Sequence, residues 1–263
     1  SETEYWNKLS IDLSSGSSSF DVFMDGPSIA WSHIASGWME PLDPYIADPD
    51  KTSPDYDFDD FYPAFIDANR WNGVPGGGMG EGNLYTMPVM TETTILSYRK
   101  DLFEKYNVKV PETFEEWAEA AAKLTLTDEG QQIYGVIQRG AKDISSINAG
   151  FHSGYYTYGA IDMDENLNSQ INSPRAVEFT TLWIDTLKKY GPPDWTNVTW
   201  YDVMQRFASG GYAMVVDNDF MAATYEDPNK SSVAGKVAYT TIPKGPDGNI
   251  ASNIWTWGLA MNS

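Results

Sequence analysis

The sequence predicts an α/β protein in which helices cover the faces of β-sheets, and three observations support this. Strand-like and helix-like segments alternate along most of the chain, the pattern expected of sheets packed against helices. With 263 residues, 41% of them hydrophobic, the chain can form one large core or two modest lobes. Its longest apolar runs, such as YAMVV, are far too short to cross a bilayer, so we expect a soluble protein.

Short strands and helices are predicted in the first hundred residues. A strand at residues 20–24 ends in the turn Asp25-Gly26-Pro27, and a helix at 28–35 is closed by Gly37. An acidic loop then leads into a helix with three inward-facing side chains, Phe61, Phe65 and Ile66. Two strand-like runs follow, at residues 84–90 and 94–100.

The helices of the second part carry clear end signals. Thr113 and Glu116 form a capping box before apolar residues at helical spacing. A second helix has Ser173 as N-cap and Pro174 at its first position, and it stops at Gly191. A third helix is predicted at 201–209, and strands are predicted at 132–140, 212–218, 235–248 and 253–263.

Six glycines between Gly73 and Gly82 raise the question of phosphate binding. No register gives the dinucleotide fingerprint, and no Gly-Lys-Ser/Thr ends the loop. No lysine or arginine lies between Arg70 and Arg99, and a strand follows instead of a helix N-terminus. We therefore interpret the loop as a flexible connector.

Charge and composition exclude several function classes. The formal charge is 17 − 37 = −20 and the pI is about 4.2, which disfavours nucleic acid, anionic membranes and polyanionic substrates. There is no cysteine, so disulfides and thiolate metal sites are excluded. The 10 tryptophans and 16 tyrosines exceed what a polar chain needs for its core, and such rings stack on sugars.

Metal binding and catalysis find weak support. The acidic segments at 55–60 and 162–168 resemble the start of a calcium loop but lack its sixth-position glycine and twelfth-position acid. His33 and His152 are expected to be ordinary polar residues at or near the surface. No nucleophile elbow is present. Paired carboxylates leave a carbohydrate-active hydrolase or lyase open as an alternative function. We predict no metal and no cofactor.

Four stretches in the right order resemble the solute-binding proteins of carbohydrate ABC importers, the maltose/sugar-binding family (extracellular solute-binding family 1). The likeness runs from about Leu9 to the last residue, and the stretches are FDVFMDGPSIAWSHIASGWMEPLD, GNLYTMPVMTETTILSYRKDLFEKYNVKVPETFEEWAEAAAKLT, FASGGYAMVVDNDF and WTWGLAM. Two departures concern the ligand more than the fold: Arg99 stands where the family usually has Asn, and Asn218-Asp219-Phe220 replaces a common Gly-x-Trp.

The resemblance implies a two-lobed periplasmic binding protein-like (type II) fold with ligand bound in a cleft between lobes. Residues 1–91 and 243–263 would form an incomplete N-lobe and 94–240 a C-lobe, with crossings near 90–95 and 241–243. It also implies an internal fragment that lacks the family's first strand and helix and its C-terminal helices. We expect such a truncated chain to be marginally stable or to associate.

The resemblance implies binding without catalysis: a mono- or oligosaccharide, or a polyol, would be held and delivered to an ABC transporter permease. A peptide or polyamine is a weaker alternative ligand. The expected location is periplasmic or extracellular. A lipid anchor on the full-length parent protein is compatible with this location.

Nine residues match ligand-binding positions of the family. Asp25 and Glu92 are predicted hydroxyl acceptors, with Asp217 and Asn218 contributing polar contacts. Alternation along the strand is expected to turn one of Trp255 and Trp257 inward. The full set of candidates is Asp25, Trp31, Glu92, Tyr155, Asp217, Asn218, Phe220, Trp255 and Trp257.

Overall fold

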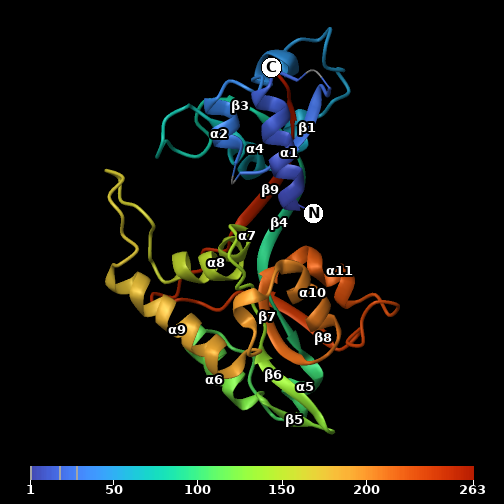
Figure 1. The fold of residues 1–263 in the computed structure, drawn as a ribbon, viewed down its shortest axis with the longest axis vertical. Helices are drawn as coiled ribbons and strands as arrows, with labels where there is room; N and C mark the ends of the chain where they lie inside the picture. The colour runs from blue at the N-terminus through green and yellow to red at the C-terminus, as the bar shows by residue number, and fades with distance from the viewer. Residues whose placement is uncertain (1, 18, 28) are drawn as a thin grey trace. The chain divides into compact units, whose positions relative to one another are not determined.

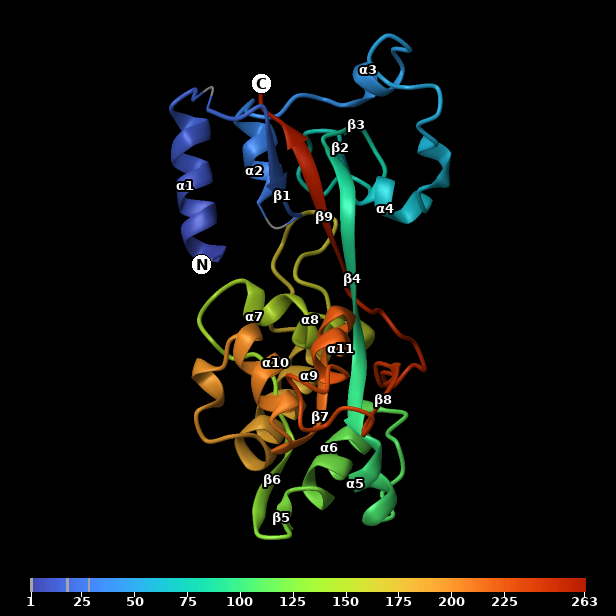
Figure 2. The same ribbon diagram turned by 90° about the vertical axis from the view of Figure 1, so that its right-hand side faces the viewer.

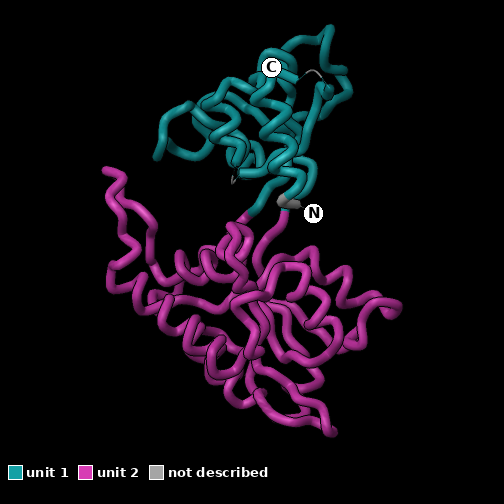
Figure 3. Tube along the Cα trace, viewed as in Figure 1, with its two compact units in different colours: residues 1–91, 255–263 teal, residues 92–254 magenta. Residues whose placement is uncertain are grey.

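The computed structural model describes residues 2–17, 19–27 and 29–263 and has mixed helices and strands (Figure 1). The chain divides into two compact units, which Figure 3 shows in different colours. Unit 1 comprises Ser1–Thr91 and Trp255–Ser263, and unit 2 comprises Glu92–Ile254. Both units are therefore α/β, as the alternation of segments predicts.

Unit 1 is built around strands from its two chain segments. The strand order is β1-β9-β4, and β1 pairs antiparallel with β9. Its elements are α1 (Glu2–Ser14), β1 (Val22–Asp25), α2 (Ala30–Ala35), α3 (Asp43–Ile46), η1 (Phe58–Asp60), α4 (Pro63–Asp67), β2 (Arg70–Trp71), β3 (Asn83–Leu84), the first part of β4 (Thr86–Arg99) and most of β9 (Ile254–Met261).

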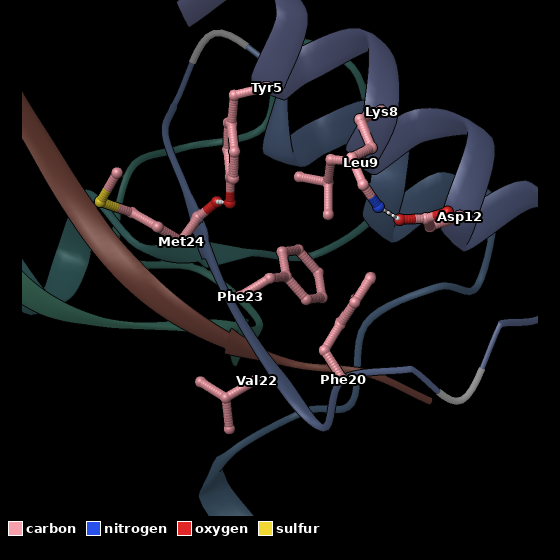
Figure 4. Close-up of a pocket in the computed structure, with 8 residues that line it drawn as sticks. All are labelled: Tyr5, Lys8, Leu9, Asp12, Phe20, Val22, Phe23 and Met24. Atoms are coloured by element: carbon pink, nitrogen blue, oxygen red, sulfur yellow. Dashed lines mark hydrogen bonds and ion pairs between the residues drawn. The ribbon is translucent and has the colours of Figure 1, made fainter.

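Helix α1 is an element that the sequence analysis missed. Leu9 and Leu13 are buried against Phe23 of β1, and the hydroxyl of Tyr5 donates to the carbonyl of Met24 at 2.6 Å. Figure 4 shows Tyr5, Leu9, Phe23 and Met24 among the residues that line a pocket here, and the volume of this pocket is about 420 Å³. Only two apolar positions of α1 are buried, so its amphipathic pattern is weak and its polar residues dominate the sequence signal.

The glycine-rich loop joins β2 to β3, which pair antiparallel. Gly82 has φ +82°, and a Cβ there would lie 2.2 Å from the carbonyl oxygen of Trp71. Gly73 has a similar φ of +80°, but a Cβ there would meet nothing within 4 Å. Of these two glycines, therefore, Gly82 is the one at which both the backbone angle and the close approach of another strand require glycine.

Unit 2 is a sheet with a hydrophobic core on each face. Its strand order is β4-β7-β6-β5, with β8 also paired to β4, and only β6 and β7 are parallel to each other. Its elements are the rest of β4, α5 (Lys100–Lys105), α6 (Phe114–Lys123), β5 (Leu126–Asp128), β6 (Gln131–Val136), α7 (Ser145–Asn148), α8 (Gly150–Thr157), α9 (Pro174–Tyr190), η2 (Trp195–Asn197), α10 (Trp200–Ala208), β7 (Tyr212–Asn218), η3 (Asp219–Met221), α11 (Ala222–Tyr225) and β8 (Val237–Thr241).

The central strand β7 contributes to both cores of unit 2. Met214 and Val216 pack in the core with α6, α8 and α9, whereas Val215 packs in the core with α10 and α11. The helix α6 has the predicted N-cap, because the Thr113 hydroxyl accepts from the Glu116 amide. Ser173 is the N-cap residue of α9 and Pro174 its first residue, as predicted, although the Ser173 side chain makes no capping hydrogen bond.

Strand β4 is a single 14-residue strand, where the sequence suggested two runs (Figure 2).

The boundary at which the chain returns from unit 2 to unit 1 differs from the expected one. The sequence analysis placed residues 243–263 in the N-lobe, but residues 243–254 lie in unit 2. Their hydrogen bonds explain this placement: the Ala251 amide donates to the Thr157 hydroxyl at 2.9 Å, and the Asn253 amide donates to the Ser153 hydroxyl at 3.0 Å.

Candidate functional site

Polar side chains gather at one edge of the unit 2 sheet, where the parallel strands β6 and β7 end. Arg139 follows β6, and Asp217 and Asn218 end β7. The antiparallel pairing of β4 with β7 places Thr94 opposite Asn218, which brings Glu92 to the same edge. Ligands of open α/β sheets bind at the carboxyl ends of such strands. We call these four residues, Glu92, Arg139, Asp217 and Asn218, the strand-end group.

Arg139 and Asp217 form a buried bidentate ion pair. Arg139 Nε lies 2.9 Å from Asp217 Oδ2 and Nη2 lies 2.5 Å from Oδ1, and the two side chains are 8% and 2% exposed. Burial lowers the pKa of Arg139, but the charge and hydrogen bonds of Asp217 outweigh it and the pKa is raised. Both carboxylate oxygens of Asp217 are thus bonded within the protein, and the predicted polar contact of Asp217 with a ligand stays a prediction.

Glu92 and Asn218 are joined by a hydrogen bond from the Asn218 amide to a Glu92 carboxylate oxygen. Glu92 is 7% exposed, whereas Asn218 is partly exposed. Next to this pair, Asp219 accepts from both the backbone amide and the hydroxyl of Thr93, at 3.1 and 3.0 Å. The edge therefore offers a carboxylate acceptor and an amide side by side, in a fixed geometry.

In unit 1, Asp25 is the residue that ends β1, and its carboxylate is fully buried. Its Oδ2 lies 2.7 Å from His33 Nδ1, and its Oδ1 accepts from the Gly26 amide at 2.7 Å. His33 is 1% exposed, so the expectation that it is a surface residue is wrong. Asp25 thus bonds its own loop and helix α2, and a ligand hydroxyl has no exposed oxygen of Asp25 to reach.

Three indole rings form what we call the tryptophan group of unit 1. Trp255 and Trp257 meet edge to face with centroids 5.6 Å apart, and Trp257 stacks on Trp6 at 5.9 Å and 7°. Residues two apart lie on the same face of a strand, so the expectation that one of the pair turns inward is wrong. A Cβ at Gly26 would lie 3.2 and 3.3 Å from Trp255 and Trp257, so this glycine lets the loop approach both rings.

The three remaining aromatic candidates differ in their exposure and in the residues that they contact. Trp31 lies on α2 and is 58% exposed. Tyr155 lies in the unit 2 core, with its hydroxyl donating to the carbonyl of Ile161, so we no longer regard it as a ligand residue. Phe220 packs edge to face on Trp200 at 5.8 Å, beside the second core.

Three residues at these sites were not singled out as ligand candidates: Trp6, His33 and Arg139. Arg139 stands three residues beyond β6, and a cation directly after a strand parallel to the Asp217 strand was the available signal. Trp6 belongs to the missed helix α1. The position of His33 eight residues after Asp25 gives no regular spacing that predicts the contact.

The acidic segments make local turns. Asp164 accepts from the backbone amides of Asn166 and Asn168 at 2.9 Å, and these hydrogen bonds, that from Asn168 first, lower its pKa. Within residues 2–17, 19–27 and 29–263, no three His, Cys, Asp or Glu side chains gather as metal ligands. The helices of these same residues include none long and apolar enough to span a bilayer.

Comparisons with known proteins identify the family of this chain. The family described as "Bacterial extracellular solute-binding protein" matches residues 1–263. The erythritol/L-threitol-binding protein of Mycolicibacterium smegmatis is 32% identical, and the match covers 100% of this chain and 55% of that protein. The mannitol-binding protein of Pseudomonas aeruginosa is 28% identical, over 97% of this chain and 55% of that protein.

A solved structure is similar over nearly the whole chain. The ABC transporter solute-binding protein of Agrobacterium vitis S4, with bound D-mannitol, has a TM-score of 0.79 and 28% identity over 99% of this chain and 59% of that one. The chain thus spans little more than half the length of these relatives. The likeness confirms the predicted type II binding-protein fold. The chain belongs to the bacterial extracellular solute-binding protein family.

Proposed function

We propose that this chain binds a neutral, polyhydroxylated ligand, a polyol or a sugar, without transforming it. The observation that carries the proposal is the Glu92–Asn218 pair at the carboxyl end of β7. A carboxylate and an amide held together accept from and donate to neighbouring hydroxyl groups, which is the chemistry of a vicinal diol.

The energetics suit such a ligand. Each hydroxyl loses hydrogen bonds to water on binding, and the site must replace them. A hydrogen bond to a charged group contributes about 1.5–3 kcal/mol, and micromolar affinity corresponds to about −8 kcal/mol. A few such bonds, with an indole face covering C–H groups of the ligand, reach this total.

The ligands named for the relatives favour polyols within the proposed ligand class. Two relatives are named for the polyols erythritol/L-threitol and mannitol, and the related structure contains D-mannitol. We therefore place acyclic polyols first and cyclic sugars second. The protein would deliver its ligand to the permease of an ABC importer outside the cytoplasm, where its family is named as extracellular. A lipid anchor on a longer parent protein is part of the same proposal.

A ligand panel tests the proposal. The 263-residue chain is titrated by calorimetry with erythritol, L-threitol, D-mannitol, maltose, and spermidine as a non-sugar control, and its melting temperature is followed with each. We expect saturable binding of at least one polyol with a rise in melting temperature, and an unchanged polyol after long incubation. Binding of spermidine alone, or of none of the panel, would overturn the proposal.

A further inference from the structure

Arg139 lies behind the proposed ligand residues. It touches Asp217, whose Oδ1 also accepts from the backbone N–H of Asn218 at 2.7 Å, and the side-chain amide of Asn218 donates to Glu92. Its third contact runs from Nη1 to the Ser145 carbonyl at 2.9 Å. These bonds fix the guanidinium between β7 and the first residue of α7, in a geometry that a planar fork satisfies and a lysine does not.

Charge is the second part of the argument. The carboxylates of Asp217, Glu92 and Asp143 all act on Arg139, and Asp219 follows directly on the β7 chain. Three carboxylates thus act on one guanidinium, so the edge retains an excess of negative charge even with Arg139 in place. Such a field attracts cations and repels anions, and in a partly buried site salt screens it little.

We infer that Arg139 is a positioning residue that aims Asn218 and Glu92 at the ligand, and that the charge of this edge restricts the site to uncharged or cationic polyols. This inference rests on the proposed function and adds the ligand charge that the site accepts. Asp217 then serves the ligand indirectly, through Asn218. A carboxylate-bearing or phosphorylated sugar would meet Glu92 and be rejected.

The experiment uses three probes of nearly the same shape and different charge: D-mannitol, 1-amino-1-deoxy-D-mannitol and D-mannonate. Affinities for wild type are measured by calorimetry at pH 7 and low salt. We expect the amine to bind at least as tightly as mannitol, and mannonate to bind at least about tenfold more weakly. Equal affinity for mannonate and mannitol would overturn the charge part of the inference.

Two variants separate positioning from charge. Arg139→Lys keeps the cation but loses the bidentate fork, so mannitol affinity should fall about tenfold while the amine-to-mannitol ratio stays at the wild-type value. Removing both charges in the double variant Arg139→Met/Asp217→Leu avoids an unpaired buried charge and should leave the fold intact. Mannitol affinity of that variant should fall more than about tenfold, since Asn218 loses its support.

If Arg139 only stabilised the fold, a double variant that folds normally would bind mannitol as wild type does. A double variant that melts like wild type and binds mannitol as tightly would overturn the positioning role of Arg139. A wild-type chain that binds no polyol at all would instead overturn the proposed function, so the two failures are distinguishable.

Discussion

Asp25 and His33 are joined by a 2.7 Å contact between Oδ2 and Nδ1, and both side chains are buried in unit 1. No partner is found among the described residues for His33 Nε2, so Asp25 is the polar group that holds the ring. The contact ties the end of β1 to helix α2, and it supports the Gly26 loop that packs on the two tryptophans.

Replacing His33 should therefore destabilise unit 1. In His33→Leu, the buried Asp25 carboxylate loses a partner, and the free energy of unfolding should fall by about 3–5 kcal/mol. Urea unfolding followed by near-UV circular dichroism measures this. The double variant Asp25→Leu/His33→Leu leaves no unpaired group and should recover part of the loss. An unchanged His33→Leu midpoint would contradict the role of the pair.

Glu92 should determine polyol affinity. Glu92→Gln keeps the shape of the side chain but replaces a charged acceptor by a neutral one, which weakens a ligand hydrogen bond by about 1–1.5 kcal/mol. The Kd for D-mannitol should rise about tenfold in calorimetry. Glu129→Gln, at a side chain that is 83% exposed, is the matched control and should bind as wild type does. Equal effects of the two variants would show that Glu92 has no special role.

Two glycines with the same backbone angle should respond differently to alanine. Gly73→Ala places a Cβ in open space, so only the positive φ costs stability, about 1–2 kcal/mol. Gly82→Ala also brings its Cβ against the Trp71 carbonyl, which should cost a further 1–3 kcal/mol or so. Thermal unfolding compares the two. The same melting temperature for both would show that the β2–β3 hairpin does not need its close approach.

The N-caps of α6 and α9 offer a second matched pair. Thr113→Ala removes the hydroxyl that accepts from the Glu116 amide, and it should lower the free energy of unfolding by about 1 kcal/mol. Ser173→Ala removes a side chain that makes no capping bond, and it should change stability by less than about 0.5 kcal/mol. The order of the two denaturation midpoints decides the matter, and a reversed order refutes the assignment.

Asp43 should make stability depend on pH in the acid range. Burial raises its pKa, but the Leu84 amide and Arg70, each at 2.7 Å, outweigh burial and the pKa is below its usual value of 3.8. A carboxyl with a lowered folded pKa contributes stability that is present above pH 4 and lost as pH falls through the folded value. Asp43→Asn should therefore melt below wild type at pH 7, and the difference should shrink as pH falls below the usual pKa of 3.8. A gap that stays constant as the pH is lowered would point to shape instead of charge.

Much of the fold was predictable because local signals agreed with the tertiary structure. The strand YAMVVDN and the capped helix after Thr113 are where their patterns place them, since both bury the apolar residues that define the pattern. Helix α1 was missed because it buries a narrow apolar stripe and is polar elsewhere. Periodicity detects the width of an apolar face, and a narrow face gives little signal.

The strand-end positions of the candidate residues were predictable, but their hydrogen-bond partners were not. Motif order located Asp25 and Asp217 at strand ends, where they stand. It did not show that His33 and Arg139 occupy their carboxylates, because these partners come from other segments with no fixed spacing. Tertiary hydrogen bonds decide which carboxylates can contact a ligand. Composition identifies candidate acids but not the residues that they bond in the folded protein.

Strand β9 lies between β1 and β4 in unit 1, yet its residues follow unit 2 in the chain. During translation, the ribosome completes all of unit 2 before it supplies the central strand that unit 1 needs. Unit 2 can therefore begin to fold while β1 and β4 of unit 1 still lack the strand that pairs between them. Newly made chains thus depend on the late arrival of nine residues, and a stalled ribosome would hold an unfinished unit 1 that chaperones would have to shield.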